Sequence, residues 1–346
     1  MKYCVTGGSG FIGTHICRSL KEQGQEVEVL DLIDPPAHHV HDRFVKGDVR
    51  DPDACRAALE GCDRVIHLAA AHHDFGIDEP TFYAVNEQGT RVLTEAMDEH
   101  GVRTICFYST VAVYGDAPRP HEETTTPVPQ SPYGASKLAG EKVLEAWTEQ
   151  GGGRRSLVIR PTVTFGIENF ANMYSLIRQV ASGKFVFFGP ASNVKSLSYV
   201  ENILEATLFL MERDGLPAFD VYNYVEKPDM TSREIAETVF KSLGKKPPSW
   251  SIPMWSARIL ALPFDVLIAL TGRNIPISSA RIKKLFVDKT QFESARIREA
   301  GFQPSVPLAE GIRRMVEWYQ AKGRLESAEW HQPPAEIVRF EREPVS

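Results

Sequence analysis

The chain has 346 residues, of which 42% are hydrophobic and 24% charged, with a formal net charge of -6. At roughly 150 residues per domain, this length predicts about two domains or one large α/β unit, which can bury a core without metal or disulfide staples. The acidic balance argues against a nucleic-acid partner, because such proteins usually carry a basic domain. The five cysteines form no Cys-x-x-Cys pair, and Met1 leads directly into an apolar strand pattern, so we expect a cytoplasmic protein without a signal peptide.

Short apolar strands alternate with helical patterns through the first half of the chain. We expect strands at residues 2–7, 27–31, 64–70, 104–110 and 156–162, and helices at 10–22, after Asp51, at 82–100 and at 133–147. Strands and helices that alternate at this spacing predict βαβ units and a Rossmann-like, doubly wound, mostly parallel sheet.

A smaller, discontinuous mixed α/β domain is expected after the sheet pattern breaks at about residue 166. The main domain takes residues 1–165 and 196–225, because a strand and helix at 196–210 return to the main sheet. The second domain takes residues 166–195 and 226–325, and a Pro-rich, charged tail takes residues 326–346.

One apolar stretch, residues 251–271, raises the question of a membrane span. It contains Arg258 and Asp265 as well as Pro253 and Pro263. These residues are costly in the middle of a spanning helix. We favour buried helices of the second domain, with a membrane span or a peripheral amphipathic contact as the alternatives.

The segment TGGSGFIG, which follows the first strand and opens a helix, is the most informative motif. Gly8, Gly10 and Gly13 satisfy G-x-G-x-x-G, and Gly7 gives a second, overlapping glycine spacing. Glycines there let backbone amides approach a pyrophosphate at the N-terminus of the helix. A plain glycine-rich turn is the alternative interpretation.

An acid at the end of the second strand strengthens the dinucleotide interpretation. Asp31 lies eighteen residues beyond Gly13, where a carboxylate accepts hydrogen bonds from the adenine ribose. It would repel a 2′-phosphate, so NAD is preferred over NADP. The alternative is a turn-forming acid. The pair Asp48-Val49 is a weaker candidate for the border of the adenine site.

Tyr133 and Lys137 form a Y-x-x-x-K pair, whose spacing places both side chains on one face of a helix. A tyrosine that works near pH 7 needs its pKa lowered by about three units, or roughly 4 kcal/mol, which a nearby ammonium can help to supply. The spacing alone is common by chance. Here the preceding strand ends at Ser109-Thr110, on the carboxyl edge where doubly wound sheets bind ligands.

One protein family has the same series of motifs in the same chain order. In this chain they are TGGSGFIG, Asp31, Asp48-Val49, HLAA, Asn86-x-x-Gly89-Thr90, STVAVYG, YGASK and RPTVTFG. Residues 1–225 closely resemble the extended short-chain dehydrogenases/reductases. YVEN at 199–202 and the late GFQPSVPLAEGIRRMVEWY are similar to the nucleotide-sugar epimerase and dehydratase branch of that family.

The resemblance implies roles for individual residues. Tyr133 would be the catalytic acid/base, Lys137 would hold the nicotinamide ribose, and Thr110 would hydrogen-bond the reacting sugar oxygen. His72 lies where such epimerases often place a cation, although a solvated loop histidine fits equally. The NAD-binding residues implied are Gly7, Gly10, Phe11, Ile12, Gly13, Asp31, Asp48, Val49, Leu68, Ala69, Ala70, Asn86, Tyr133 and Lys137.

Two departures from the family pattern affect the substrate. A sugar 4,6-dehydratase would show Asp-Glu after Thr110, but this chain has Val111-Ala112; Val163 replaces a frequent substrate-contacting Asn. Other groups must therefore meet the substrate phosphates. Our candidates are Asn172, Lys195 and Ser196, with a solvent-exposed loop lysine as the alternative for Lys195.

The resemblance implies an NAD-dependent 4-epimerase that acts on a nucleotide-diphosphate sugar, expected to be UDP-linked, through a 4-keto intermediate. The alternatives are a 4-keto-sugar reductase or sugar dehydrogenase, a 3β-hydroxysteroid-type enzyme, and a non-catalytic dinucleotide-binding protein. We expect no metal, although His38, His39 and His41 cluster. In resembling proteins the helices at 82–100 and 133–149, here carrying Val92, Leu93, Leu138 and Val143, form a homodimer interface.

Overall fold

Seven parallel strands form the central sheet of the protein, described here from a computed structural model. The structure describes residues 1–73, 76–115, 119–256, 262–263, 290–326, 333, 335 and 337. Across the sheet the strands are β11 (Phe219–Tyr224), β6 (Arg155–Pro161), β5 (Thr104–Tyr108), β4 (Arg64–His67), β1 (Lys2–Thr6), β2 (Glu26–Asp31) and β3 (Arg43–Lys46). The predicted doubly wound parallel sheet is confirmed.

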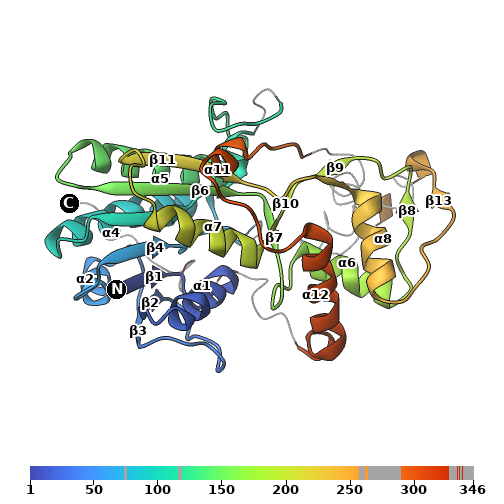
Figure 1. Cartoon of the computed structure of the whole chain (residues 1–346), viewed down its shortest axis with the longest axis horizontal. Helices are drawn as coiled ribbons and strands as arrows, with labels where there is room; N and C mark the ends of the chain where they lie inside the picture. Colours follow the sequence, from blue (N-terminus) through green and yellow to red (C-terminus); the bar gives the residue numbers. More distant parts are fainter. Residues whose placement is uncertain are drawn as a thin grey trace.

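Helices cover both faces of this sheet (Figure 1). One face packs against α1 (Phe11–Glu22) and α7 (Val200–Glu212), and the other against α2 (Pro52–Leu59), α4 (Gly89–Glu99) and α5 (Pro132–Glu149). Successive residues of a strand point to opposite faces, so Tyr3 and Val5 join the first core while Cys4 joins the second. Strands buried on both sides are mostly apolar, which gives them a recognisable sequence pattern.

The helix predicted at 82–100 is in fact three segments. A short helix, α3 (Glu79–Tyr83), passes through a π-helical turn, η1 (Ala84–Gln88), into α4. Such π turns inside helices often occur at functional sites. This turn carries Asn86, one of the predicted cofactor residues.

Three helices, α6 (Asn172–Ala181), α8 (Ser232–Ser242) and α12 (Leu308–Ala321), enclose a separate core at the other end of the molecule (Figure 1). We call this end the C-terminal lobe. The remaining elements are β7 (Val163–Phe165), β8 (Phe187–Phe188), β9 (Val194–Lys195), β10 (Leu197–Tyr199), β12 (Met230–Thr231), β13 (Ser251–Ile252), α11 (Ala295–Glu299), η2 (Val111–Val113) and η3 (Gly323–Leu325).

The strand expected at 196–200 does not join the main sheet. Instead, β10 pairs in parallel with β7 in a two-stranded sheet, and only the following helix, α7, packs on the main sheet. The exact division of the chain into two domains and a tail stays a prediction.

Residues 251–271 lie largely outside the described residues. Within the part of the chain that the structure describes, no helix is long and apolar enough to cross a membrane. Trp255 and Leu262, which are described, are exposed rather than buried.

The apolar residues cited for a dimer interface already serve the core of one chain. Val92, Leu93 and Val143 are buried within the chain, and Leu138 packs against the cluster around Val113. The dimer therefore depends on the family resemblance alone.

Candidate active site

The loop between β1 and α1 is shaped so that only glycine fits at two positions. Gly7 has φ +71°, in the left-handed region, and a Cβ there would lie 2.5 Å from the backbone nitrogen of Ala69. A Cβ on Gly13 would lie 2.4 Å from the carbonyl oxygen of Gly7. Gly10 precedes α1, whose first residues are Phe11 and Ile12. The loop therefore forms a cradle at the positive end of α1 that suits a pyrophosphate.

Asp31, the last residue of β2, points its carboxylate toward this loop. Oδ2 accepts a hydrogen bond from the Ser9 amide at 2.9 Å, and Oδ1 accepts one from the Ile33 amide at 3.2 Å. Burial raises the pKa of this carboxyl, and the two amides oppose that effect. A carboxylate held beside a phosphate loop is the arrangement expected for recognition of a ribose diol.

The other predicted cofactor residues surround this loop. Leu68 donates its amide to the Thr6 carbonyl at 2.9 Å, so the run through Ala69 and Ala70 lies against the glycines. Val49 is buried. Asp48 pairs with Arg50, with 2.6 Å between Oδ2 and Nη2.

Asn86 is fully engaged by the protein itself. Its Oδ1 accepts from the Ala71 amide at 2.9 Å, and its Nδ2 donates to the Ala71 carbonyl at 3.0 Å and to Ser136 Oγ at 2.9 Å. The π turn thus links the segment that follows β4 to α5. Its contact with the cofactor stays a prediction.

Helix α5 carries Tyr133 and Lys137 one turn apart at its beginning. Ser131 caps the helix by accepting from the Gly134 amide at 3.1 Å. A Cβ on Gly134 would lie 2.6 Å from the Ala112 carbonyl oxygen, so glycine lets α5 approach the turn that follows Thr110 closely. Thr110 Oγ1 accepts from the Ala112 amide at 3.1 Å, which leaves its own proton to donate elsewhere. The start of α5, which carries Tyr133 and Lys137, therefore packs against the turn that follows Thr110 at the carboxyl end of β5.

Lys137 is a buried amine in need of a partner. Its side chain is fully buried, and among the described residues Nζ has no hydrogen-bond partner. Nζ lies 3.9 Å from the ring centroid of Phe107. Burial lowers the pKa of Lys137 to about 7, against the charge of Glu141, which raises it. A buried amine without a hydrogen-bond partner among the described residues, lying against Phe107 of β5, is suited to donate to the hydroxyls of a nicotinamide ribose.

A neutral histidine on β4 lies near Lys137 and hydrogen-bonds two threonines. His67 Nδ1 lies 2.6 Å from Thr6 Oγ1, and Nε2 lies 3.1 Å from Thr90 Oγ1. Burial, with Lys137 nearby, lowers the pKa of His67 to about 3. His67 therefore adds no positive charge near Lys137 at neutral pH.

A buried ion pair links the same face of α5 to the sheet. Glu141 accepts from Arg160 Nε at 2.9 Å and from the Ser109 hydroxyl. Arg160 Nη1 also donates to the Tyr114 hydroxyl at 2.9 Å, which in turn donates to Asn223 Oδ1 at 2.8 Å. The pair is almost completely buried, so it fixes Ser109, and with it the neighbouring Thr110, to α5.

The predicted substrate residues lie on separate elements. His72 is exposed, with its ring centroid 4.3 Å from that of His73, while Asn172 begins α6 and is exposed. Ser196 donates to Asp229 Oδ1 at 2.8 Å, inside the C-terminal lobe, beside Lys195 in β9. Their contacts with a substrate stay predictions.

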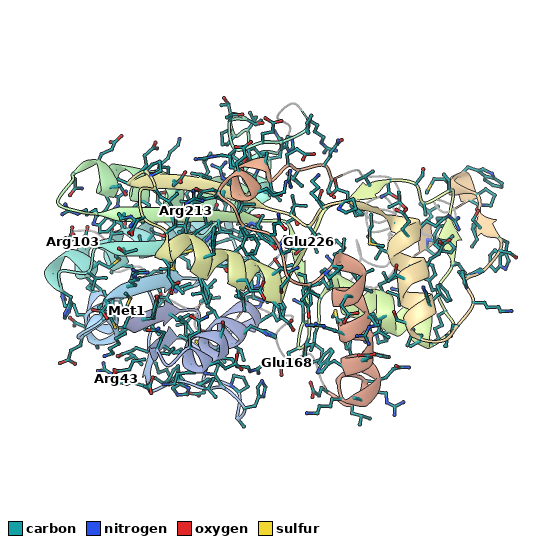
Figure 2. The ribbon with its side chains drawn as sticks, in the orientation of Figure 1. Met1, Arg43, Arg103, Glu168, Arg213 and Glu226 are labelled. Atoms are coloured by element: carbon teal, nitrogen blue, oxygen red, sulfur yellow. The ribbon has the colours of Figure 1, made fainter. Side chains whose placement is uncertain are left out.

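Glu168 joins the cofactor loop side to the C-terminal lobe and lies between the two in Figure 2. Its carboxylate is 3.6 Å from Arg18 and 3.4 Å from His38. His15, on α1, holds the Ile167 carbonyl at 2.9 Å. These contacts fix α1 against the segment that leads from β7 into α6. Among the described residues no group of three or more His, Cys, Asp or Glu side chains is arranged to hold a metal.

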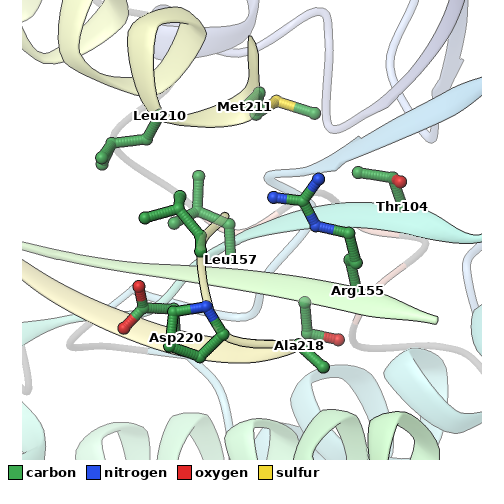
Figure 3. A pocket seen from close by; sticks show the side chains of 10 residues that line it. Thr104, Arg155, Leu157, Leu210, Met211, Ala218 and Asp220 are labelled. Atoms are coloured by element: carbon green, nitrogen blue, oxygen red, sulfur yellow. The ribbon is translucent and has the colours of Figure 1, made fainter. Parts of the chain in front are cut away.

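A small hollow elsewhere on the sheet is unrelated to this site. It lies between α7 and the starts of β5 and β6, with Thr104, Arg155 and Leu210 among its walls (Figure 3). Because strands bind ligands at their carboxyl ends in this architecture, the hollow lies at the wrong edge for the cofactor.

Comparison with known proteins gives the same picture. The model of the NAD dependent epimerase/dehydratase family matches residues 3–224. The chain belongs to this family. The predicted family is therefore confirmed.

Three relatives show the range within the family. The N-acetyl-alpha-D-glucosaminyl-diphospho-ditrans,octacis-undecaprenol 4-epimerase of Escherichia coli O157:H7 is 38% identical over 91% of this chain and 94% of its own. The dTDP-glucose 4,6-dehydratase of Streptomyces niveus is 28% identical over 92% of this chain and 93% of its own. The UDP-glucose 4-epimerase of Thermus thermophilus, solved with NAD, is 26% identical, covers 93% of this chain and 100% of that structure, and has a TM-score of 0.72.

The family assignment confirms that the protein is an enzyme and that its cofactor is NAD. The predicted class, an NAD-dependent epimerase of activated sugars, is confirmed by the same relatives. Which residues contact cofactor and substrate stays a prediction. It is supported by the cradle of glycines and by the amine of Lys137, which has no hydrogen-bond partner in the described part of the chain.

Sequence reasoning missed the ion pair between Glu141 and Arg160. Two signals were present: Glu141 follows Lys137 by four residues, and Arg160 directly follows the apolar run 157–159 of a buried strand. A charge in a buried strand needs a partner, and a partner four residues from the predicted lysine would share its helix face.

Proposed function

We propose that the protein interconverts the two configurations at carbon 4 of a sugar that is joined to a diphosphate. The observation that carries the proposal is the close packing of the start of α5, which carries Tyr133 and Lys137, against the turn after Thr110 at the carboxyl end of β5. A dehydratase needs an additional acid and base, and the positions after Thr110 hold Val111 and Ala112 instead.

Each residue has a defined task in this proposal. Tyr133 removes the proton of the 4-hydroxyl and later returns it, and its place in the first turn of α5 favours the phenolate because the helix N-terminus is positive. Lys137 favours the same phenolate while its charge is present. Thr110 donates its free proton to the sugar oxygen.

The cradle of Gly7, Gly10 and Gly13 would hold the pyrophosphate of NAD, and Asp31 its adenine ribose. Held there, NAD would supply reversible hydride transfer at carbon 4, with the hydride returned to the opposite face of the sugar. A 4-keto-sugar reductase would use the same residues in one direction. The epimerase is favoured because the chain resembles epimerases whose NAD stays bound.

The carrier of the sugar has two candidates. We propose a nucleotide diphosphate, namely UDP, because structures similar to this chain include UDP-glucose 4-epimerases. The second candidate is a polyprenyl diphosphate, favoured by the relative that is 38% identical and is named for an undecaprenol-linked N-acetylglucosamine. The chemistry at carbon 4 is the same for both.

The test compares the two carriers on one sugar. Purified protein is given N-acetylglucosamine linked to UDP or, in detergent, to a polyprenyl diphosphate, with no reductant, and the product sugars are separated by chromatography. The nucleotide proposal predicts a higher kcat/KM for the UDP-linked sugar. A preference for the lipid-linked sugar selects the second candidate, and turnover of neither overturns both.

A homodimer in the cytoplasm completes the proposal, supported by the resemblance to dimeric sugar epimerases. Light scattering at micromolar concentration should give twice the mass of the 38.6 kDa chain. A monomeric mass would contradict the dimer without affecting the proposed reaction.

A further inference from the structure

Two segments of the C-terminal lobe lie side by side at the end of the molecule away from the main sheet (Figure 1). We call residues 181–189 and 241–256 the lobe tip. They are joined by the pairing of β8 with β13, by a 2.8 Å bond from the Gly189 amide to the Ile252 carbonyl, and by Lys245 Nζ, which donates to the Val180 carbonyl at 3.3 Å. The lobe tip is therefore one continuous surface.

Large aromatic side chains are exposed on this surface. Trp250 is 58% exposed and Trp255 is 70% exposed. A tryptophan side chain presents a large apolar area together with one N–H donor, a combination that suits the boundary between water and an apolar phase. Two such side chains within six residues are unusual for a surface that faces only water.

The charge of the lobe tip is opposite to that of the whole protein. Its two segments contain four exposed lysines and no aspartate or glutamate, although the chain has a net charge of -6. The lysines are Lys184, Lys241, Lys245 and Lys246. Exposed lysines and exposed tryptophans carried by the same two paired segments match the surface of an anionic bilayer, where each lysine is attracted to lipid headgroups and tryptophan occupies the interface.

We propose that the lobe tip is a peripheral binding surface for an anionic phospholipid bilayer. Trp250 and Trp255 would enter the headgroup region, with Lys184, Lys241 and Lys246 above the lipid phosphates. The proposal rests on the proposed function for its purpose: a polyprenyl-linked sugar, the second candidate substrate, resides in a membrane, so docking would bring the enzyme to it. The binding itself requires no sugar.

Sedimentation with vesicles tests this directly. The full-length protein is mixed with vesicles of phosphatidylcholine alone or with about 40% phosphatidylglycerol, a composition chosen to mimic an anionic leaflet. The double variants Trp250→Ser/Trp255→Ser and Lys184→Glu/Lys246→Glu should each lower the partition coefficient on anionic vesicles at least about tenfold. The variant Lys322→Glu/Arg324→Glu, with the same change of charge on exposed residues outside the lobe tip, should bind as the wild type does.

The outcomes separate this inference from the proposed function. Turnover of UDP-linked sugar in the absence of vesicles should be unchanged in all these variants, because none of the substituted residues lies in the candidate active site. No binding of the wild type to anionic vesicles overturns the inference while leaving the epimerase proposal intact. Binding that is lost with the lysines but unchanged without the tryptophans would show attraction by charge alone, and would overturn the entry of Trp250 and Trp255 into the headgroup region.

Discussion

Tyr133 and Lys137 occupy successive turns at the start of α5, and only Lys137 is completely buried. Replacing Tyr133 with Phe removes one hydroxyl and keeps the ring that lies 6.3 Å from that of Phe82. We expect kcat to fall on the order of a hundredfold or more, as loss of a general acid/base does, while NAD remains bound. Tyr319→Phe, on α12, is the matched control and should leave kcat unchanged; a similar kcat for both variants would remove Tyr133 from the chemistry.

Cofactor choice depends on Asp31. The wild-type protein should bind NAD more tightly than NADP, because the carboxylate repels a 2′-phosphate. Asp31→Ser should narrow this difference, as measured by the Kd of each dinucleotide. Asp34→Ser removes an exposed carboxylate three residues away, paired with Lys46 at 2.9 Å, and should leave the ratio unchanged. Tighter binding of NADP by the wild type would contradict the role of Asp31.

The pKa of Lys137 makes a prediction about stability. Its ordinary pKa is 10.5 and burial lowers it to about 7, so between these values the unfolded chain holds one more proton than the folded chain. The free energy of unfolding therefore rises by about 1.4 kcal/mol per pH unit as the pH rises from about 7 toward 10.5. Below about pH 7 Lys137 is charged in both states, and the destabilisation of the folded protein by this buried charge is at its maximum.

The measurement compares wild type and Lys137→Met, both freed of NAD, by denaturant unfolding between pH 7 and 9. Lys137→Met should be the more stable protein at pH 7, and its advantage should shrink as the pH rises. Lys322→Met, which removes an exposed ammonium, should show the same pH dependence of unfolding free energy as the wild type. A constant difference between wild type and Lys137→Met would show that Lys137 is not held as a depressed amine.

At the scale of elements, the close approach of α5 to the turn after β5 depends on Gly134. Helix propensity alone predicts that Gly134→Ala stabilises the protein, by up to about 1 kcal/mol. The structure predicts the opposite, because the new Cβ would lie 2.6 Å from the Ala112 carbonyl oxygen and must push α5 away. We expect a lower melting temperature and a kcat reduced at least about tenfold, since Tyr133 moves relative to Thr110. A more stable and fully active variant would show that the approach is not required.

The elements that could be predicted are those with local signals. The glycine loop, Asp31 and the YGASK segment each lie within a short stretch whose pattern is independent of the rest of the chain, and the structure places each at the carboxyl edge of the sheet. The π turn at Asn86 could not be predicted, because it arises from hydrogen bonds to Ala71 and Ser136, which are distant in sequence.

Pairings between segments distant in sequence could not be predicted either. The strand at 197–199 has the apolar character of a main-sheet strand, but its partner is β7, which follows the main-sheet strand β6 directly. The Glu141–Arg160 pair spans 19 residues; Arg160 begins the motif RPTVTFG, but Glu141 lies outside the motifs that carried the family resemblance. Tertiary contacts decide such features, and one sequence without its fold does not display them.

Across the whole molecule, the residues predicted to bind the cofactor and those predicted to bind the substrate lie in different parts of the chain. The parallel sheet supplies the cradle, Asp31 and the catalytic helix, while the C-terminal lobe, fastened through Glu168, carries Asn172, Lys195 and Ser196. This division explains why the reaction at carbon 4 is better defined than the carrier of the sugar. The reacting groups lie on a rigid sheet edge, whereas the predicted phosphate contacts are spread over several elements of the lobe.

The central claim is that one bound NAD takes a hydride from carbon 4 and returns it to the same sugar. The direct test uses UDP-N-acetylglucosamine carrying deuterium at carbon 4, and its polyprenyl-linked counterpart, incubated with purified protein in the absence of NADH. We expect conversion to the 4-epimer of at least one of these substrates, with the deuterium retained in the product. If neither sugar changes until NADH and a keto-sugar are supplied, or if the deuterium is lost to dinucleotide in solution, the enzyme is a reductase or dehydrogenase and not an epimerase.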